Sequence, residues 1–240
     1  MAVLHVIQSG SSGNAYVIKT ALGNVLLECG VPWASVLSAM DYNIMDLVAV
    51  LCTHGHADHT QYLQQVREQT MCNNIWSTPE VAVEYGINAF QPKTKHTLCG
   101  VGGVALRVPH STECYAYVVD LPCGEGRLLF ATDCGDFPYH VKGVNYMLIE
   151  ANWDRNIVLE RHFEGEESNA STIGAHMELE KTLEVVERHR STMLREVVLC
   201  HLSARNINAD KCITTFQQHA GITPKIARRG LRVELSLDDF

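Results

Sequence analysis

Three histidines and one aspartate stand close together in the stretch "THGHADH". They are His54, His56, Asp58 and His59. Imidazole nitrogens and carboxylate oxygens are the usual ligands of Zn²⁺ and similar divalent ions. A solvated, histidine-rich turn is the plainer alternative, and a single histidine would favour it. Four donors directly after an apolar run favour a metal site instead.

Three more apolar runs end on a residue that binds metals in other proteins. These residues are His110, Asp133 and His201. Taken singly, each has an ordinary explanation as a capping aspartate or a core histidine with a partner. If the runs are neighbouring strands, however, their ends meet at one edge of a sheet. Together with the first cluster they supply enough ligands for two metal ions.

The elements that must position these residues are mostly strands. Strands are predicted at 2–8, 15–20, 24–30, 46–53, 74–78, 103–110, 114–121, 126–133, 145–152, 195–201 and 230–235. Helices are predicted at 33–40, from about 60 to 68, at 78–86, 177–190 and 208–221. The nearly continuous apolar run at 46–53 is typical of a buried strand. The acidic segment 164–172 is expected to be the least ordered part of the chain.

Strands outnumber helices, and the helices lie between groups of strands. This order predicts an α/β protein with two sheets and helices on the outside. The length of 240 residues is enough for a sizeable core. No linker or repeat interrupts the pattern, so we expect a single domain over residues 1–240.

Composition limits the cell compartments and the binding partners that are expected for the protein. No apolar run reaches the length of a membrane helix, and the N-terminal stretch lacks the features of a secretory signal. The nine cysteines show no CxxC spacing, which favours free thiols and a cytoplasmic protein. The net charge of −8 argues against nucleic-acid binding over the whole surface. The basic segment 225–235 is a local exception, and a solvated terminal strand explains it equally well.

The stretch "THGHADH" resembles the HxHxDH signature of the metallo-β-lactamase fold superfamily, and the later candidate ligands follow in the order of its later motifs. The implied fold is an αββα sandwich of two mixed β-sheets flanked by helices, with metals at one edge. The resemblance also implies a ligand set. One metal would be bound by His54, His56 and His110, the other by Asp58, His59 and His201, with Asp133 bridging them.

The cofactors implied by this resemblance are two divalent metal ions. Zn²⁺ is favoured, while Mn²⁺ and Fe are alternatives, because histidine-rich sites accept several metals. A hydroxide between two ions roughly 3.5–4 Å apart would then be the nucleophile. Dimers are common in this superfamily, so a homodimer is a further expectation by analogy.

Four other segments narrow the resemblance to one part of the superfamily. They are "SGSSGNAYVI" (9–18), "IEANWD" (149–154), "GAHMELEKTLEVV" (174–186) and "CHLSARNIN" (200–208). They resemble motifs of the YycJ (WalJ)-like hydrolases and, more loosely, of tRNase Z, which are phosphodiesterase branches. The segment between Asp133 and His201 has no room for the long substrate arm of tRNase Z, so tRNA processing is disfavoured.

By the same resemblance, Asp58 and His176 are the catalytic residues. His176 would open a helix near the scissile phosphate and protonate the leaving oxygen. A surface histidine is the alternative. Ser203 and Arg205 would contact the phosphate, although both also suit an ordinary turn.

Two glutamates depart from the family pattern. Glu28 stands where the family usually has an aspartate that supports a metal ligand, and it can serve the same purpose. Glu178 stands where a small hydroxyl residue is usual. A carboxylate near a phosphate is repulsive, so this position puts the substrate geometry in doubt.

The leading hypothesis is therefore a metal-dependent phosphodiesterase, a nuclease acting on DNA. Hydrolysis of small cyclic nucleotides is the alternative, which the acidic net charge favours because a small substrate needs no basic track. A thioester hydrolase and an inactive metal-binding interaction protein are less favoured. The expected partner is DNA or a cyclic nucleotide, and no membrane is expected.

Overall fold

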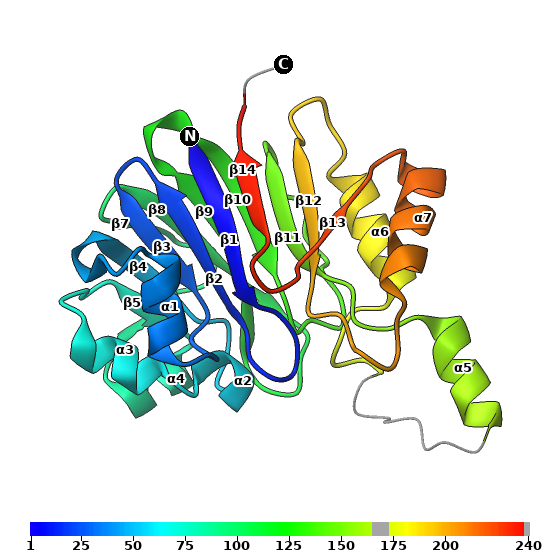
Figure 1. The fold of residues 1–240 in the computed structure, drawn as a ribbon, viewed down its shortest axis with the longest axis horizontal. Helices are drawn as coiled ribbons and strands as arrows, with labels where there is room; N and C mark the ends of the chain where they lie inside the picture. Colours follow the sequence, from blue (N-terminus) through cyan, green and yellow to red (C-terminus); the bar gives the residue numbers. More distant parts are fainter. Residues whose placement is uncertain (165–172, 238–240) are drawn as a thin grey trace.

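The computed structural model describes residues 1–164 and 173–237, and it contains two seven-stranded sheets (Figure 1). The first sheet has the order β14 (Arg232–Leu235), β1 (Ala2–Gln8), β2 (Ala15–Thr20), β3 (Gly23–Leu27), β4 (Leu47–Leu51), β5 (Ile75–Ser77) and β6 (Asn88–Ala89). The second has the order β13 (Lys225–Ile226), β12 (Glu196–Cys200), β11 (Tyr146–Glu150), β10 (Gly126–Ala131), β9 (Cys114–Leu121), β8 (Val101–Val108) and β7 (Lys95–Leu98). Both sheets are mixed, because each contains parallel and antiparallel pairs.

The two sheets share one hydrophobic core. Alternate residues of β1, such as Leu4 and Val6, point into it and are almost fully buried. The rings of Tyr16 on β2 and Phe130 on β10 meet edge to face across it, with centroids 5.7 Å apart. This packing ties the two sheets together and fixes how their strand ends face each other.

Helices cover the outer face of each sheet (Figure 1). The first sheet carries α1 (Trp33–Ala39), α2 (Ala57–Thr60), α3 (Leu63–Gln69) and α4 (Pro79–Tyr85), and the second carries α6 (Leu179–Arg188) and α7 (Ala209–Ala220). Two short 3₁₀ helices are η1 (Ile44–Asp46) and η2 (Pro122–Gly124). The αββα sandwich expected from the sequence is therefore confirmed. Among the described helices, none combines the length and apolar character needed to cross a membrane.

The helix predicted after the histidine cluster was wrong in its bounds. The helix expected from about 60 to 68 is two helices, α2 and α3, and the first begins at Ala57. The two part at Tyr62, whose N–H donates to the carbonyl of Cys29 at 2.9 Å rather than continuing α2. As a result, Asp58 and His59 lie within a short helix whose position is fixed by the end of β3.

The helix α5 (Arg155–Phe163) was not predicted, and it extends away from the sandwich in Figure 1. None of its residues is buried, so its sequence carries no apolar stripe to reveal it. Asp154 caps it by accepting from the N–H groups of Asn156 and Ile157. The segment 164–172, expected to be least ordered, lies outside the described residues except for Glu164, the C-cap of α5.

Candidate metal centre

The candidate ligands follow the ends of strands from both sheets. His54 comes three residues after β4 in the first sheet. His110, Asp133 and His201 follow β8, β10 and β12 of the second sheet. All seven residues singled out in the sequence meet at this edge of the sandwich, in two groups that share one aspartate.

The first group consists of His54, His56, His110 and Asp133. Nε2 of His54 lies 2.9 Å from Nδ1 of His56, which in turn lies 3.2 Å from Nε2 of His110. Oδ2 of Asp133 lies 3.8 Å from Nε2 of His54 and 4.0 Å from Nε2 of His110. Three imidazoles and one carboxylate thus point their donor atoms at one small space.

The second group consists of Asp58, His59, His201 and the same Asp133. Nε2 of His59 lies 3.3 Å from Oδ2 of Asp58 and 3.3 Å from Oδ2 of Asp133. Nε2 of His201 lies 3.5 Å from Oδ2 of Asp58 and 3.5 Å from Oδ1 of Asp133. Asp133 therefore faces both groups.

These separations suit divalent cations. Metal–ligand bonds of about 2.0–2.1 Å in a tetrahedral arrangement place neighbouring ligand atoms roughly 3.3 Å apart. The donor atoms of both groups are spaced around this value, and all within a group lie within 4.8 Å of one another. Converging imidazole nitrogens are also poor hydrogen-bond partners, because at most one of each pair can donate to the other. The cluster fits a binuclear divalent metal site.

Burial and nearby charge shift the pKa values of His54, in the first group, and His201, in the second, in opposite directions. Burial, helped by the charge of His59, holds the pKa of the His54 imidazole well below its usual value. Burial acts to lower the pKa of His201 too, but the carboxylates of Asp133, Asp58 and Glu150 outweigh it and raise that pKa to about 10. His201 therefore carries a proton that a bound cation must displace.

The two carboxylates of the centre are ionised. Burial acts to raise the pKa of Asp133, but the charges of His59 and His201 hold it well below the usual value. Hydrogen bonds from His201 and His59 likewise overcome burial and lower the pKa of Asp58. Negative charge is therefore present at the point where both groups meet.

Three residues of the centre have left-handed backbone. Glu28, Asp133 and His201 have φ values of 63°, 50° and 51°. Such a conformation is uncommon for residues other than glycine and costs about 1–3 kcal/mol each. Each of the three lies within two residues of a strand end, where the bend turns the side chain toward the ligands.

The glycine- and serine-rich turn after β1 supports the second group. Nδ2 of Asn14 lies 3.3 Å from Oδ2 of Asp58, and the N–H of Asn14 donates to the carbonyl of Asp58 at 2.7 Å. Oγ of Ser9 accepts from the N–H of His201 at 2.8 Å. Gly30 makes the close approach feasible, because a Cβ there would lie 1.7 Å from the carbonyl oxygen of Asp58.

Glu28 supports a ligand, as its place in the family pattern suggests. Its side chain is fully buried, and Oε1 lies 3.4 Å from Nδ1 of His59. Both of its carboxylate oxygens also accept from the N–H of Thr53, at 3.3 Å and 3.2 Å. The carboxylate thus joins the end of β3 to the loop that begins the histidine cluster.

His176 does not open a helix, contrary to the expectation from the sequence. The helix α6 begins at Leu179, and His176 lies in the turn before it. Its Nδ1 lies 2.7 Å from Oε1 of Glu150, and its ring stacks on His201 with centroids 5.2 Å apart. Burial acts to lower the pKa of His176, but the hydrogen bond and charge of Glu150 raise it.

Glu150 was missed as a functional residue, although it lies in the segment 149–154 that carried the family resemblance. It is fully buried at the end of β11. Oε1 lies 3.3 Å from Nδ1 of His201, and Oε2 accepts from the N–H groups of Cys134 and Met177. One carboxylate therefore orients both His176 and His201, and its signals in the sequence were its place in that segment and its position at the end of a buried strand.

Glu178 is paired with a cation. The guanidinium of Arg155 donates to both carboxylate oxygens of Glu178, at 2.7 Å and 2.9 Å. The Glu178 side chain is only 4% exposed. Its charge is therefore neutralised by Arg155, and the residue joins α5 to the start of α6.

Ser203 and Arg205 lie in the turn after His201. Oγ of Ser203 accepts from the N–H groups of Arg205 and Asn206, at 3.4 Å and 3.3 Å. This is the pattern of an ordinary serine turn. Arg205 is exposed, and its carbonyl accepts from Arg161. Contact of either residue with phosphate stays a prediction.

Comparison with known proteins agrees with this geometry. Residues 9–133 match the model of the Metallo-beta-lactamase superfamily, whereas no curated protein sequence matches the chain. Among solved structures, the chain is similar to the metallo-beta-lactamase fold protein YhfI from Bacillus subtilis, with a TM-score of 0.74, 17% identity and coverage of 98% of this chain and 100% of that one.

Two further structures share the fold. A diphosphatase of the PhnP family has a TM-score of 0.68 and 16% identity, covering 98% of each chain. Human tRNase Z, short form, has a TM-score of 0.64 and 13% identity, covering 98% of this chain and 99% of that one. The family model spans more than half of the 240 residues, and the chain therefore belongs to the metallo-beta-lactamase superfamily of metal-dependent hydrolases.

Proposed function

We propose that this protein is a metal-dependent phosphodiesterase that cleaves DNA. The observation that carries the proposal is the pair of His176 and Glu150 beside the metal centre. A hydrolase of phosphodiesters must supply a proton to a poor leaving group, an alkoxide, and a carboxylate-bound imidazole suits that task. The resemblance to a PhnP-family diphosphatase and to a tRNase in fold agrees with phosphoryl chemistry.

The metal centre would supply the nucleophile and part of the electrostatic stabilisation. The two groups described above would hold two divalent ions, for which the nitrogen and oxygen donors favour Zn²⁺. When bound, such ions make hydroxide available near neutral pH and offset the negative charge of the attacked phosphate.

The chain's own residues would orient the water and move the protons. The Asp58 carboxylate, which stays ionised, would accept a hydrogen bond from the attacking water and align it. Nδ1 of His176 is engaged by Glu150, so Nε2 is the atom that would give its proton to the leaving oxygen. The side chain of His176 is 21% exposed, which leaves it accessible to a substrate.

A second candidate is hydrolysis of small cyclic nucleotides at the same centre. The net charge of −8 favours it, because a long polyanion needs a basic surface whereas a small substrate does not. The residues and proton transfers would be the same. The two candidates differ only in the length of the phosphodiester that the protein accepts.

The test is hydrolysis by the metal-loaded protein of bis-p-nitrophenyl phosphate, single-stranded DNA, duplex DNA, a cyclic nucleotide and a thioester at fixed salt. Cleavage of bis-p-nitrophenyl phosphate and DNA that stops with a chelator is the expected result. Cyclic-nucleotide hydrolysis without DNA cleavage would establish the second candidate. Thioester hydrolysis alone, or two bound metals without any turnover, would refute both.

A further inference from the structure

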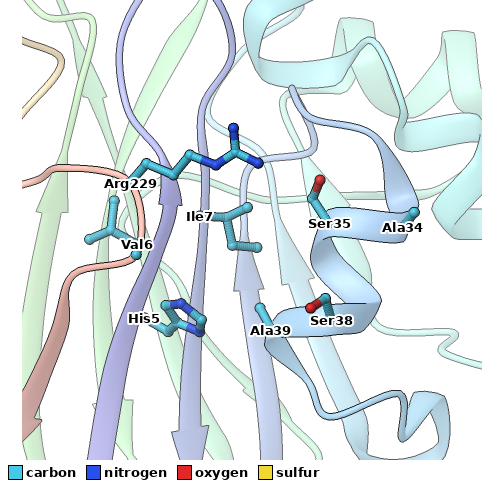
Figure 2. Close-up of a pocket in the computed structure, with 9 residues that line it drawn as sticks. His5, Val6, Ile7, Ala34, Ser35, Ser38, Ala39 and Arg229 are labelled. Atoms are coloured by element: carbon cyan, nitrogen blue, oxygen red, sulfur yellow. The ribbon is translucent and has the colours of Figure 1, made fainter.

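A pocket lies between β1, the helix α1 and the turn that precedes β14, and its cavity volume is about 310 Å³ (Figure 2). Its lining consists of His5, Val6, Ile7, Ala34, Ser35, Ser38, Ala39, Arg229 and Gly230. None of these residues belongs to the candidate metal centre or supports one of its ligands. The volume is within the range of small-molecule sites in proteins.

The pocket has an apolar floor and a polar rim. Ile7 and Ala39 are buried on the side of α1, and they give the floor its apolar character, whereas the side chain of Val6 points into the core between the sheets. Four polar side chains surround this floor: His5, Ser35, Ser38 and Arg229. No carboxylate lines the pocket, and Arg229 and the two serines can donate to an anion.

His5 carries the strongest sign of a missing partner. Its Nδ1 is buried and has no hydrogen-bond partner within the part of the chain that the structure describes. Leaving such a group unpaired costs free energy that a bound acceptor or donor would recover. Burial, followed by the charges of Arg232 and Lys19, lowers the pKa of His5. A backbone hydrogen bond to Ala39 acts against this shift and engages the one N–H of the neutral imidazole, so the unpaired Nδ1 is left to accept from a ligand.

Arg229 brings the positive charge. It is exposed and forms no ion pair with the described residues. Its turn is fixed to β1, because Gly230 donates to the carbonyl of Val6 at 2.8 Å and Val6 donates to Leu231 at 2.9 Å. In Figure 2 its guanidinium extends over Ile7 on the side of Ser35, while His5 lies on the side of Ser38 and Ala39.

We propose that this pocket binds a small organic phosphate monoester, with its phosphate on Arg229 and Ser35 and its organic part over Ile7 and Ala39, toward His5 and Ser38. A guanidinium fork and a hydroxyl together offer more donors than a carboxylate has oxygens, whereas a phosphate can engage all of them. The apolar floor would bury part of the organic group.

The test is an NMR titration of the isotope-labelled, metal-loaded protein with phenyl phosphate. We expect the backbone signals of Ser35, Ser38 and Gly230 to shift together and to give a single dissociation constant. The variant Arg229→Gln should bind at least tenfold more weakly. Arg228→Gln, a neighbouring exposed arginine outside the pocket, should bind as the unchanged protein does. The ³¹P spectrum checks that the ester stays intact during the titration.

A second variant and three other compounds complete the test. Ser38→Glu adds a carboxylate at an exposed position and should abolish binding without affecting the fold. Inorganic phosphate, benzoate and benzyl alcohol should each bind at least tenfold more weakly than phenyl phosphate. Equal binding by any of them overturns the proposal, and so does the absence of shifts at the pocket or an unchanged affinity in Arg229→Gln.

Discussion

The carboxylate of Glu150 lies 2.7 Å from Nδ1 of His176, across the gap between the end of β11 and the turn before α6. The contact fixes which imidazole nitrogen faces the metal centre. Because Glu150 is fully buried, it cannot turn away to water when a substrate arrives. The geometry of the proposed proton donor is therefore set before any substrate binds.

The first prediction concerns the leaving group. His176→Ala should lower turnover of an unactivated dinucleotide by about 10²–10⁴-fold, since protonation assists the departure of an alkoxide. Turnover of bis-p-nitrophenyl phosphate should fall much less, because p-nitrophenolate leaves without a proton. Steady-state kinetics on both substrates measure the two losses of turnover, and the metal content is determined for each preparation. His140→Ala, at the surface, serves as the control. Equal losses on both substrates, accompanied by loss of metal, would assign His176 a structural role.

The second prediction separates the two metal groups. Asp133 belongs to both of the groups described above, whereas His201 belongs to the second of them and not to the first. Asp133→Asn should therefore lower the affinity for both ions. His201→Ala should lower the affinity for one ion by more than the ~10–100-fold typical of losing a supporting residue. Competition with a chelator, followed by metal analysis, measures this difference. If Asp133→Asn retained both ions at full affinity, the bridging assignment would be wrong.

The third prediction concerns the close approach of two loops. In Gly30→Ala the new Cβ would lie 1.7 Å from the carbonyl oxygen of Asp58, so α2 must move. We expect a loss of more than about 3 kcal/mol in the free energy of unfolding and weakened metal binding. Gly55→Ala, inside the histidine cluster, meets only a Val81 methyl at 3.3 Å and should cost about 1 kcal/mol or less. Urea denaturation and metal titration compare the two variants.

The fourth prediction is a pH dependence of stability away from the metal centre. Asp120 accepts from Arg127 at 2.6 Å and from Lys95 at 3.0 Å. Burial acts to raise its pKa, but these hydrogen bonds lower it. Its ionised form therefore stabilises the folded state above the unfolded pKa of about 3.9, and this contribution disappears as the pH falls through the lowered folded value.

The corresponding variant is Asp120→Asn. Because the side chain is 30% exposed, solvent screens the interaction, and we expect a loss of about 1 kcal/mol at pH 7. The difference from the unchanged protein should begin to shrink below about pH 4, where the carboxylate of the unfolded chain takes up a proton, and it should disappear once the pH falls through the lowered folded pKa. Urea denaturation at several pH values measures it, with exposed Glu234→Gln as control. A difference that stays constant with pH would mean that shape, not charge, matters at this position.

Much of the fold followed from the sequence because its signals are local. Buried strands such as β4 and β9 are short apolar runs, and α4 has its N-cap, first-turn proline and C-terminal glycine in order. The seven candidate ligands could be identified from the sequence for the same reason, since each follows such a run or lies in one compact stretch. The residues that surround them were harder to identify.

What the sequence could not supply is contact between distant segments. Asn14 reaches Asp58 across 44 positions, and Glu150 reaches His176 across 26. In the sequence Glu150 is only the polar end of a strand. In the structure β11 pairs with β12, and this pairing brings Glu150 beside His201. The start of α6 was misplaced because the carbonyl of Met177 accepts from the N–H of Asn152, a distant residue, rather than from an N–H within the helix. No local pattern encodes such a bond.

The hydrogen bond from His201 to Ser9 joins residues 192 positions apart, near the two ends of the fold. Its consequence concerns the order of events during folding. Residues 54–59 can gather early because they are neighbours in the chain, but the second group is complete only after β1 and β12 have found their places. Full metal affinity should therefore develop last, so that a partly folded chain holds an ion only weakly and the finished one retains it.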